Sequence, residues 1–204
     1  VSAVGHGNRR VIDAICAQAR DYLHLMVYGE AVESPQVRYA ERIASLLPDP
    51  LDTVYFVNSG SEAVEGALKL AKRYTGRTEL VYYRNAYHGS TAGSLSVMGG
   101  EEYRNSYRPL LPDTRCIRFN EPGDLKYITS RTACVIIEPV QGEGGDRPFG
   151  KGLSGSVAPP LRRDRRAARF RRDTDRAGPD RHALFFSAVR RRARYTMYGQ
   201  GVRR

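Results

Sequence analysis

Short runs of β-branched and aromatic residues alternate with stretches of helical periodicity over the first 150 residues of this 204-residue chain. The runs occupy residues 53–57, 80–83, 115–119 and 133–137. Between and before them, apolar residues recur with the spacing of one face of an amphipathic helix. Strands that alternate with helices in this way form a mostly parallel sheet with helices on both faces. The sequence therefore predicts an α/β fold.

Three helices are predicted from this spacing and from their end signals. Val11, Ile12, Ile15 and Ala19 lie on one face of the first. The second begins at Ser34, which a proline follows, and stops before the Pro-Asp-Pro of residues 48–50. The third starts after residue 59 and ends at Gly76, because glycine readily takes the left-handed conformation that closes a helix.

The charge of the chain changes abruptly near residue 150. Residues 1–150 carry 17 Lys and Arg against 18 Asp and Glu, a net charge of −1. Residues 151–204 carry 16 against 4, a net charge of +12, and contain no Glu, Ile, Asn or Cys. We therefore divide the chain into residues 1–150 and an Arg-rich tail, residues 151–204. So high a density of like charge predicts a tail that is disordered or irregular, or at best a helix.

Two classes of protein can be excluded at this level. No stretch reaches the roughly 20 consecutive apolar residues that span a bilayer, and residues 1–20 lack the pattern of a signal peptide. These features predict a soluble, cytoplasmic protein with no membrane partner. Cys16, Cys116 and Cys134 are widely spaced, and no second ligand completes a zinc pattern. We expect free structural thiols and no metal site.

The segment after the first predicted strand is a candidate anion site. Ser59, Gly60 and Ser61 lie where a helix is predicted to begin. The free amides of a first helical turn and the helix dipole favour an anion, glycine permits close approach, and serine hydroxyls can donate. Small residues at a helix start are also ordinary caps, and neither a Walker sequence nor Gly-x-Gly-x-x-Gly is present. Both interpretations stay open.

Two further segments follow predicted strands, at the sheet edge where α/β proteins bind ligands. In the first, Tyr87 offers a ring face to a planar ligand and His88 a donor or acceptor, although packing also explains such a pair. In the second, Glu138 closes an apolar strand, where a buried carboxylate is costly unless paired, which indicates a functional acid. Glu143 lies among glycines and is either functional or a solvated loop charge.

In order and spacing, the motifs of residues 1 to about 146 resemble those of the class III, fold-type I aminotransferases, which depend on pyridoxal phosphate. This group includes acetylornithine, ornithine, 4-aminobutyrate and glutamate-1-semialdehyde aminotransferases. The matching motifs are Phe56-Val57-Asn58-Ser59-Gly60-Ser61-Glu62-Ala63, Tyr87-His88-Gly89, Pro109-Leu110-Leu111-Pro112 and Glu138-Pro139-Val140-Gln141-Gly142-Glu143-Gly144-Gly145. The resemblance implies that residues 1–150 form part of the large domain of that fold.

The resemblance also implies a cofactor, pyridoxal 5′-phosphate, and the residues around it. Gly60 and Ser61 would hold its phosphate through backbone amides, and Tyr87 would stack on its pyridine ring. The full set of implied cofactor-binding residues is Ser59, Gly60, Ser61, Tyr87, His88, Gly89 and Glu138.

For the substrates, the resemblance implies an amine or amino-acid donor and a 2-oxo acid acceptor. Glu143 matches an acid that pairs with an Arg and gates the substrate site, and Tyr28 would face the substrate. Members of the family are homodimers with their sites at the interface, so a homodimer is expected.

Two residues indispensable to this family have no counterpart in the tail as written. They are the Lys that forms a Schiff base with the cofactor and the Asp that pairs with the pyridine nitrogen. Lys151 is the only Lys after Lys126, and it falls too early. We therefore predict a truncated, inactive version with no catalytic residue, which binds the cofactor weakly or not at all.

A shift of reading frame accounts for both missing residues. Read one nucleotide later, codons for residues 171–184 can encode Asp-Glu-Ile-Gln-Thr-Gly-Leu-Gly-Arg-Thr-Gly-Thr-Leu, which resembles the family's Asp-bearing strand. Codons for residues 193–201 can likewise encode Pro-Asp-Ile-Leu-Cys-Met-Gly-Lys, which resembles the approach to the Lys. We place the slip within residues 146–152. The Asp codon then straddles residues 171–172 and the Lys codon residues 200–201.

Two other functions are open for such a chain. Taken at face value, the tail suits an Arg-rich nucleic-acid-binding segment, but it lacks the aromatic interleaving or recognised motif that sequence-specific binding would add, since its aromatic residues are few and scattered. Because a frame shift explains the Arg richness, nucleic acid is not the expected partner. The other alternative is a non-catalytic remnant that still dimerises with an intact relative.

Overall fold

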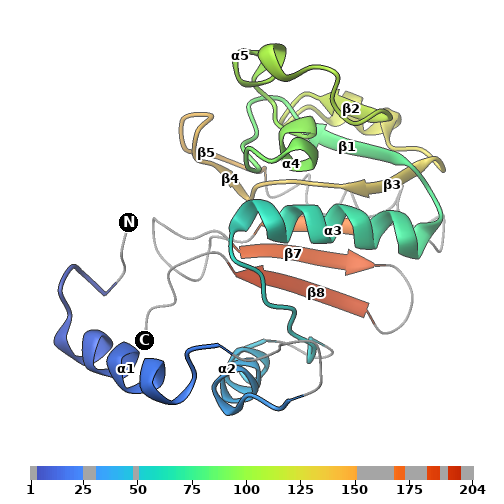
Figure 1. Cartoon of the computed structure of the whole chain (residues 1–204). Helices are drawn as coiled ribbons and strands as arrows, with labels where there is room; N and C mark the ends of the chain where they lie inside the picture. The colour runs from blue at the N-terminus through green and yellow to red at the C-terminus, as the bar shows by residue number, and fades with distance from the viewer. Residues whose placement is uncertain are drawn as a thin grey trace. The chain divides into compact units, whose positions relative to one another are not determined.

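The computed structural model of the chain describes residues 4–24, 31–47 and 51–150 in full, and the backbone of residues 168–172, 183–188 and 193–198. The chain divides into two units, and the boundary falls between Tyr55 and Phe56. Each unit is described by itself (Figure 1). Tyr28, predicted to face the substrate, lies outside the described residues.

The first unit holds two helices, α1 (Arg9–Asp21) and α2 (Ser34–Ala44). A proline lies in the first turn of α2, where its missing amide hydrogen costs no hydrogen bond. Both helices confirm the prediction from apolar spacing. The apolar stripe of α1 is nevertheless exposed, because none of the residues of this helix is buried; Ile15, for example, is 62% exposed.

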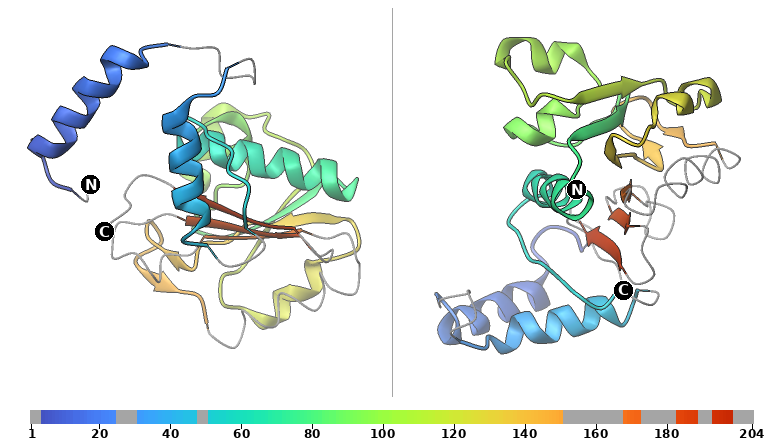
Figure 2. Two further views of the ribbon diagram at one scale, coloured as in Figure 1. Left: turned by 90° about the horizontal axis from the view of Figure 1, so that it is seen from below. Right: turned by 90° about the vertical axis from the view of Figure 1, so that its right-hand side faces the viewer.

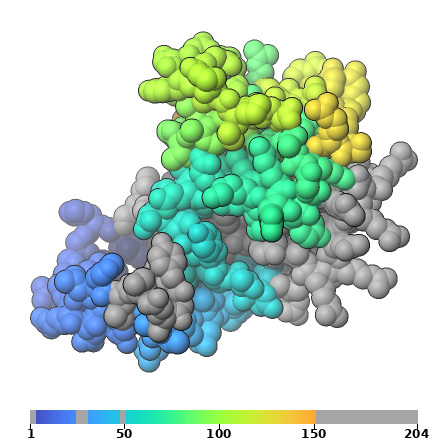
Figure 3. All heavy atoms as spheres, turned by 45° about the vertical axis from the view of Figure 1, so that its right-hand side comes forward, coloured from blue at the N-terminus to red at the C-terminus, as the bar shows by residue number. Residues whose placement is uncertain are grey.

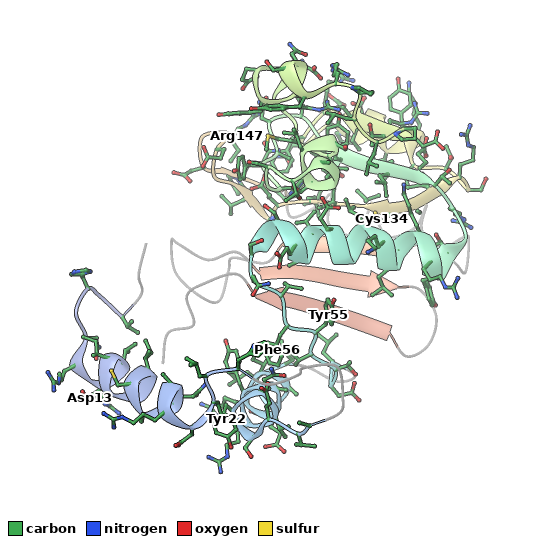
Figure 4. The ribbon with its side chains drawn as sticks, viewed as in Figure 1. Asp13, Tyr22, Tyr55, Phe56, Cys134 and Arg147 are labelled. Atoms are coloured by element: carbon green, nitrogen blue, oxygen red, sulfur yellow. The ribbon has the colours of Figure 1, made fainter. Side chains whose placement is uncertain are left out.

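The prediction of a strand at residues 53–57 is wrong. Residues 51–57 form neither helix nor strand, and Tyr55 is 83% exposed (Figure 4). Aromatic and β-branched residues fit a pleated surface, but a strand also needs a neighbouring backbone to complete its hydrogen bonds. Among the described residues no strand pairs with this segment. It therefore runs as an irregular connection into the next helix.

The second unit is built on a six-stranded sheet of order β2-β1-β3-β6-β7-β8 (Figures 1 and 2). Its strands are β1 (Glu79–Tyr83), β2 (Thr114–Ile117), β3 (Thr132–Val135), β6 (Ala168–Arg172), β7 (Ala183–Ala188) and β8 (Ala193–Tyr198). The first four in chain order are parallel, whereas β7 and β8 are antiparallel to their neighbours. The mostly parallel α/β sheet is confirmed.

Alternate residues of β1 enter two different cores, as the period of two in a strand requires. Leu80 and Tyr82 pack on one face with buried side chains of α3. Val81 and Tyr83 pack on the opposite face, with Leu125 from the 3-10 helix η2. The outer side of α3 lies at the surface (Figure 3). The other elements of this unit are α3 (Gly60–Thr75), α4 (Ala92–Ser96), α5 (Glu101–Arg104), η1 (Asn105–Tyr107), η2 (Pro122–Tyr127), β4 (Val140–Gln141) and β5 (Arg147–Pro148).

Part of the tail is more regular than its charge predicts. Strand β6 runs parallel to β3, with Ala168 opposite Cys134 and Arg169 opposite Val135. Strand β7 is antiparallel to both β6 and β8. Each of the three strands contains aromatic residues, which favour extended structure. The average composition of the tail conceals these short runs, and this corrects the expectation for those residues; the rest of the tail lies outside the described residues.

No helix that the structure describes is long and apolar enough to cross a bilayer. The described residues also contain no group of three His, Cys, Asp or Glu side chains that could hold a metal ion. The three cysteines are free thiols.

The thiols differ in burial, and this gives a test of the fold. Cys134 in β3 is 0% exposed (Figure 4), whereas Cys16 and Cys116 are exposed. Burial raises the pKa of the Cys134 thiol strongly. Cys116 is exposed as a residue, but partial desolvation of its sulfur also raises the pKa of that thiol. Because the thiolate is the reactive form, we expect iodoacetamide at neutral pH to modify Cys16 first, Cys116 more slowly and Cys134 only after unfolding. Peptide mass spectrometry checks this, and rapid native labelling of Cys134 would contradict the packing of β3.

Candidate functional site

The N-terminus of α3 leaves two backbone amides for an anion. Ser59 is the N-cap, and its hydroxyl accepts a hydrogen bond from the amide of Glu62 at 3.2 Å. The Glu62 carboxylate accepts in turn from the amide of Asn58 at 2.7 Å. Within the described residues, no acceptor is assigned to the amides of Gly60 and Ser61. The capping interpretation therefore fits Ser59, and the anion interpretation fits Gly60 and Ser61.

The approach to these two amides is open and electrically favourable. Gly60 is exposed, and a side-chain carbon built on it would meet no atom within 4 Å. The aligned peptide dipoles of a helix place about half a positive charge at its N-terminus, and α3 is 16 residues long. A phosphate-sized anion can therefore reach the start of α3 without displacing a described side chain of this unit.

Gly89 brings the loop after β1 onto the first turn of α3. Its φ of +121° is a conformation that only glycine adopts readily. A Cβ atom at this position would stand 2.2 Å from Oγ of Ser61 and 2.9 Å from Oγ of Ser94. Only glycine fits so close to Ser61. The two segments singled out in the sequence, residues 59–61 and 87–89, therefore lie against each other.

The same loop is tied to the end of β3. The amide of Tyr87 donates to Oε2 of Glu138 at 3.0 Å, and Glu138 is 2% exposed. The Tyr87 hydroxyl lies 3.2 Å from Oγ of Ser90. Its ring meets that of Tyr103 edge-on, with 6.4 Å between the ring centroids. The structure thus places a buried carboxylate against the backbone of Tyr87 and holds the Tyr87 ring at two points.

His88 and Glu143 are the remaining predicted site residues. His88 is 5% exposed, so it shapes the loop from inside, as the packing interpretation requires. Glu143 is exposed at the tip of the β4–β5 hairpin, where the amide of Gly145 donates to the carbonyl of Gly142 at 3.0 Å. Among the described residues, no hydrogen bond or ion pair is assigned to the Glu143 side chain. Its gating role stays a prediction.

Sequence reasoning missed two polar supports of the site, one buried and one partly buried. Gln141 is 0% exposed, and its Nε2 donates to the carbonyl of Arg84 at 2.7 Å. Glu65 reaches from α3 to cap α4, where its Oε1 accepts from the amide of Gly93 at 2.7 Å. The signal available for Gln141 was its place three residues after Glu138, the acid that closes an apolar strand.

One family model matches most of the chain. It is described as Aminotransferase class-III, and it matches residues 1–158, which include every residue of the cluster just described. The chain belongs to the class III aminotransferase family. Pyridoxal phosphate is the cofactor of this family, and one of its solved members, ornithine aminotransferase from Toxoplasma gondii, holds it at partial occupancy.

Curated relatives share the same part of the chain. The [LysW]-aminoadipate semialdehyde/glutamate semialdehyde transaminase of Sulfurisphaera tokodaii is 39% identical over 149 residues, which are 72% of this chain and 38% of that protein. Acetylornithine aminotransferase of Clostridium acetobutylicum is 36% identical over 161 residues, 74% of this chain and 40% of that protein. The chain thus spans about two fifths of the length of these class III relatives.

Solved class III structures share the fold. Adenosylmethionine-8-amino-7-oxononanoate aminotransferase from Methanocaldococcus jannaschii superposes with a TM-score of 0.71 at 27% identity, over 79% of this chain and 42% of that one. An (S)-enantioselective omega-transaminase from Thermomicrobium roseum gives a TM-score of 0.74 at 26% identity, again over 79% of this chain and 42% of that one. The partial fold-type I large domain expected from the sequence is confirmed.

Proposed function

We propose that Gly60 and Ser61 bind the phosphate of pyridoxal 5′-phosphate. The observation that carries the proposal is the contact between Gly89 and Ser61, which only glycine permits. It joins two available amides at a helix N-terminus to the loop that bears an aromatic ring. Backbone amides and the helix dipole together favour a phosphate, and the Ser61 hydroxyl adds a donor. The residues present therefore fit this cofactor.

The ring of the cofactor would lie against Tyr87, with His88 and Gly89 shaping the loop. When bound, the cofactor supplies the electron sink for amino-group transfer. The chain's own residues would orient the cofactor. The Tyr87 ring contacts Tyr103, its hydroxyl contacts Ser90, and its backbone amide donates to Glu138. Glu143, on its exposed hairpin, would act on the substrate side.

The proposed reaction moves an amino group from an amine or amino-acid donor to a 2-oxo acid. The names of the relatives given above refer to acetylornithine and to [LysW]-aminoadipate semialdehyde/glutamate semialdehyde. By this similarity, we propose a linear donor with a terminal amine, in a cytoplasmic homodimer. The proposal concerns the whole enzyme, of which this chain spans about two fifths by comparison with those relatives.

The chain as written is proposed to be inactive, because residues 151–204 are out of frame and the Lys and Asp are lost. The register of β6 against β3 supports the proposed position of the lost Asp. Arg169 lies opposite Val135, and β6 ends at Arg172, three residues further on. Glu138 is likewise three residues beyond Val135. The Asp codon, which straddles Arg171 and Arg172, would therefore return an acid to the sheet edge at which Glu138 lies.

A non-catalytic remnant that dimerises with an intact relative is the second candidate. The exposed apolar stripe of α1, Val11, Ile12 and Ile15, supports it, because an exposed apolar patch can serve as an interaction surface. Co-purification with a full-length class III aminotransferase separates this candidate from an isolated fragment.

The phosphate site can be tested by removing one amide without disturbing the helix. Gly60 is the first residue of α3, and proline is well tolerated there. Gly60→Pro should weaken binding of pyridoxal 5′-phosphate about tenfold to a hundredfold, the worth of a hydrogen bond to a charged group. Gly60→Ala keeps the amide, adds a methyl in open space, and is the matched control. Isothermal titration calorimetry measures both.

Two results would contradict the proposed site. Equal affinity in Gly60→Pro and Gly60→Ala would show that the Gly60 amide does not meet the phosphate. Equal affinity of the unaltered chain for pyridoxal and pyridoxal 5′-phosphate would show that no phosphate subsite exists at the start of α3.

A further inference from the structure

A buried amide side chain links the two loops of the site. Gln141 ends β4 and is 0% exposed. Its Nε2 donates to the carbonyl of Arg84 at 2.7 Å, at the start of the loop that carries Tyr87. This bond joins residues 57 positions apart in the sequence.

The same side chain supports the hairpin that carries Glu143. A Cβ atom on Gly144 would stand 3.0 Å from both Cβ and Oε1 of Gln141, and 3.2 Å from the carbonyl oxygen of Asn85. The backbone of the hairpin tip therefore rests directly on Gln141 and on the loop after β1. A Cβ at position 144 would require Gln141 or the Asn85 carbonyl to give by a few tenths of an ångström.

The loop after β1 is held from its other side as well. The amide of Gly99 donates to the carbonyl of Ala86 at 2.7 Å, and a Cβ on Gly99 would stand 2.3 Å from the amide nitrogen of Asn85. Gln141 and Gly99 thus both hydrogen-bond to the backbone of residues 84–86. Tyr87 follows immediately, so these two contacts add to those that Glu138, Ser90 and Tyr103 make with it.

The burial of Gln141 is not explained by stability alone. Its Oε1 is buried and has no hydrogen-bond partner among the described residues. A buried acceptor without a partner destabilises a fold, and an apolar side chain of the same volume would avoid that penalty. The hydrogen bond from Nε2 of Gln141 to the carbonyl of Arg84 is therefore what the buried amide contributes.

We propose that Gln141 is a positioning residue that couples the Tyr87 loop to the Glu143 hairpin. It would set where the Tyr87 ring stands relative to the amides of Gly60 and Ser61, and so where the cofactor ring lies once its phosphate is bound. The inference rests on the proposed function for its ligand, but the coupling itself is a property of the two loops.

Hydrogen exchange and ligand discrimination test the coupling together. Gln141→Leu keeps the volume and removes the donor, so amide exchange, read by mass spectrometry, should rise about tenfold, the worth of one hydrogen bond, in both residues 84–89 and residues 142–146. The affinity for pyridoxal 5′-phosphate should fall about tenfold, while that for inorganic phosphate stays unchanged. Gln18→Leu, on the exposed surface of α1, is the control and should change neither.

Labelling of Cys134 by iodoacetamide reports whether a variant has lost its fold. A second variant tests the coupling in case Gln141→Leu does not fold. Gly144→Ala leaves the amide donor of Gln141 in the chain but crowds Gln141 and the Asn85 carbonyl, so it should raise exchange in the same two segments. Unchanged exchange in residues 84–89 in both variants, or an equal loss of affinity for both ligands, would overturn the coupling. If the chain with its reading frame restored binds neither ligand, the proposed function fails, and the exchange result in the unaltered chain still decides the role of Gln141.

Discussion

Alanine at Gly89 is expected to abolish binding of pyridoxal 5′-phosphate and to lower the free energy of unfolding by about 2–5 kcal/mol, from backbone strain and overpacking together. The φ of +121° is strained for any residue with a Cβ, and that Cβ would stand 2.2 Å from Oγ of Ser61. The loop must therefore lift from α3. Once it lifts, Tyr87 loses its place beside the phosphate amides. Chemical denaturation and calorimetric titration measure the two effects.

Gly76→Ala is the matched control that has the backbone strain of Gly89→Ala without the contact with Ser61. Gly76 closes α3 with a φ of +68°, but a Cβ there would meet no atom within 4 Å. The cost of alanine in that left-handed conformation is about 1–2 kcal/mol, and cofactor binding should be unaffected. If Gly89→Ala were no more destabilising than Gly76→Ala and still bound the cofactor, the contact with Ser61 would not hold the site together.

The comparison between two similar segments shows what the sequence can predict about the fold. Residues 53–57 and residues 80–83 have the same strand-like composition, yet only the second forms a strand, β1. The two segments differ in their neighbouring strands. β1 lies between β2 and β3, whereas no described strand pairs with residues 53–57. Helix α3 was predictable to its last residue, because its hydrogen bonds are internal and Gly76 ends it.

For the site, the sequence indicates residue types but not their contacts. Tyr87 and Glu138 were each singled out for their place after a strand, and their hydrogen bond joins residues 51 positions apart. The contact of Gly89 with Ser61 depends on how the sheet stacks on α3, which no local pattern contains. Gln141 was missed for the same reason, since its burial follows from the fold of the hairpin over residues 84–86.

Restoring the reading frame should convert a chain that forms no covalent cofactor adduct into one that does. The change is deletion of one nucleotide within the codons of residues 146–152, with translation continued to the next stop codon in that phase. On the proposed frame shift, we expect the restored sequence to carry an Asp at the codon straddling Arg171 and Arg172 and a Lys at the codon straddling Gln200 and Gly201. These residues would pair with the pyridine nitrogen of the cofactor and form the Schiff base with it.

Borohydride reduction measures the outcome as presence or absence of a stable phosphopyridoxyl group on a single peptide. We expect it on the restored Lys, and we expect no specific label in the chain as written, because Lys151 precedes β6 and no other Lys follows Lys126. The matched control is the restored frame with that one Lys codon changed to Ala, which should lose the label and keep the protected Cys134. A specific label on any Lys of the unaltered chain, or a nucleotide sequence that no single-base change returns to an open frame, would refute the frame shift. In either case the Arg-rich tail would need a function of its own.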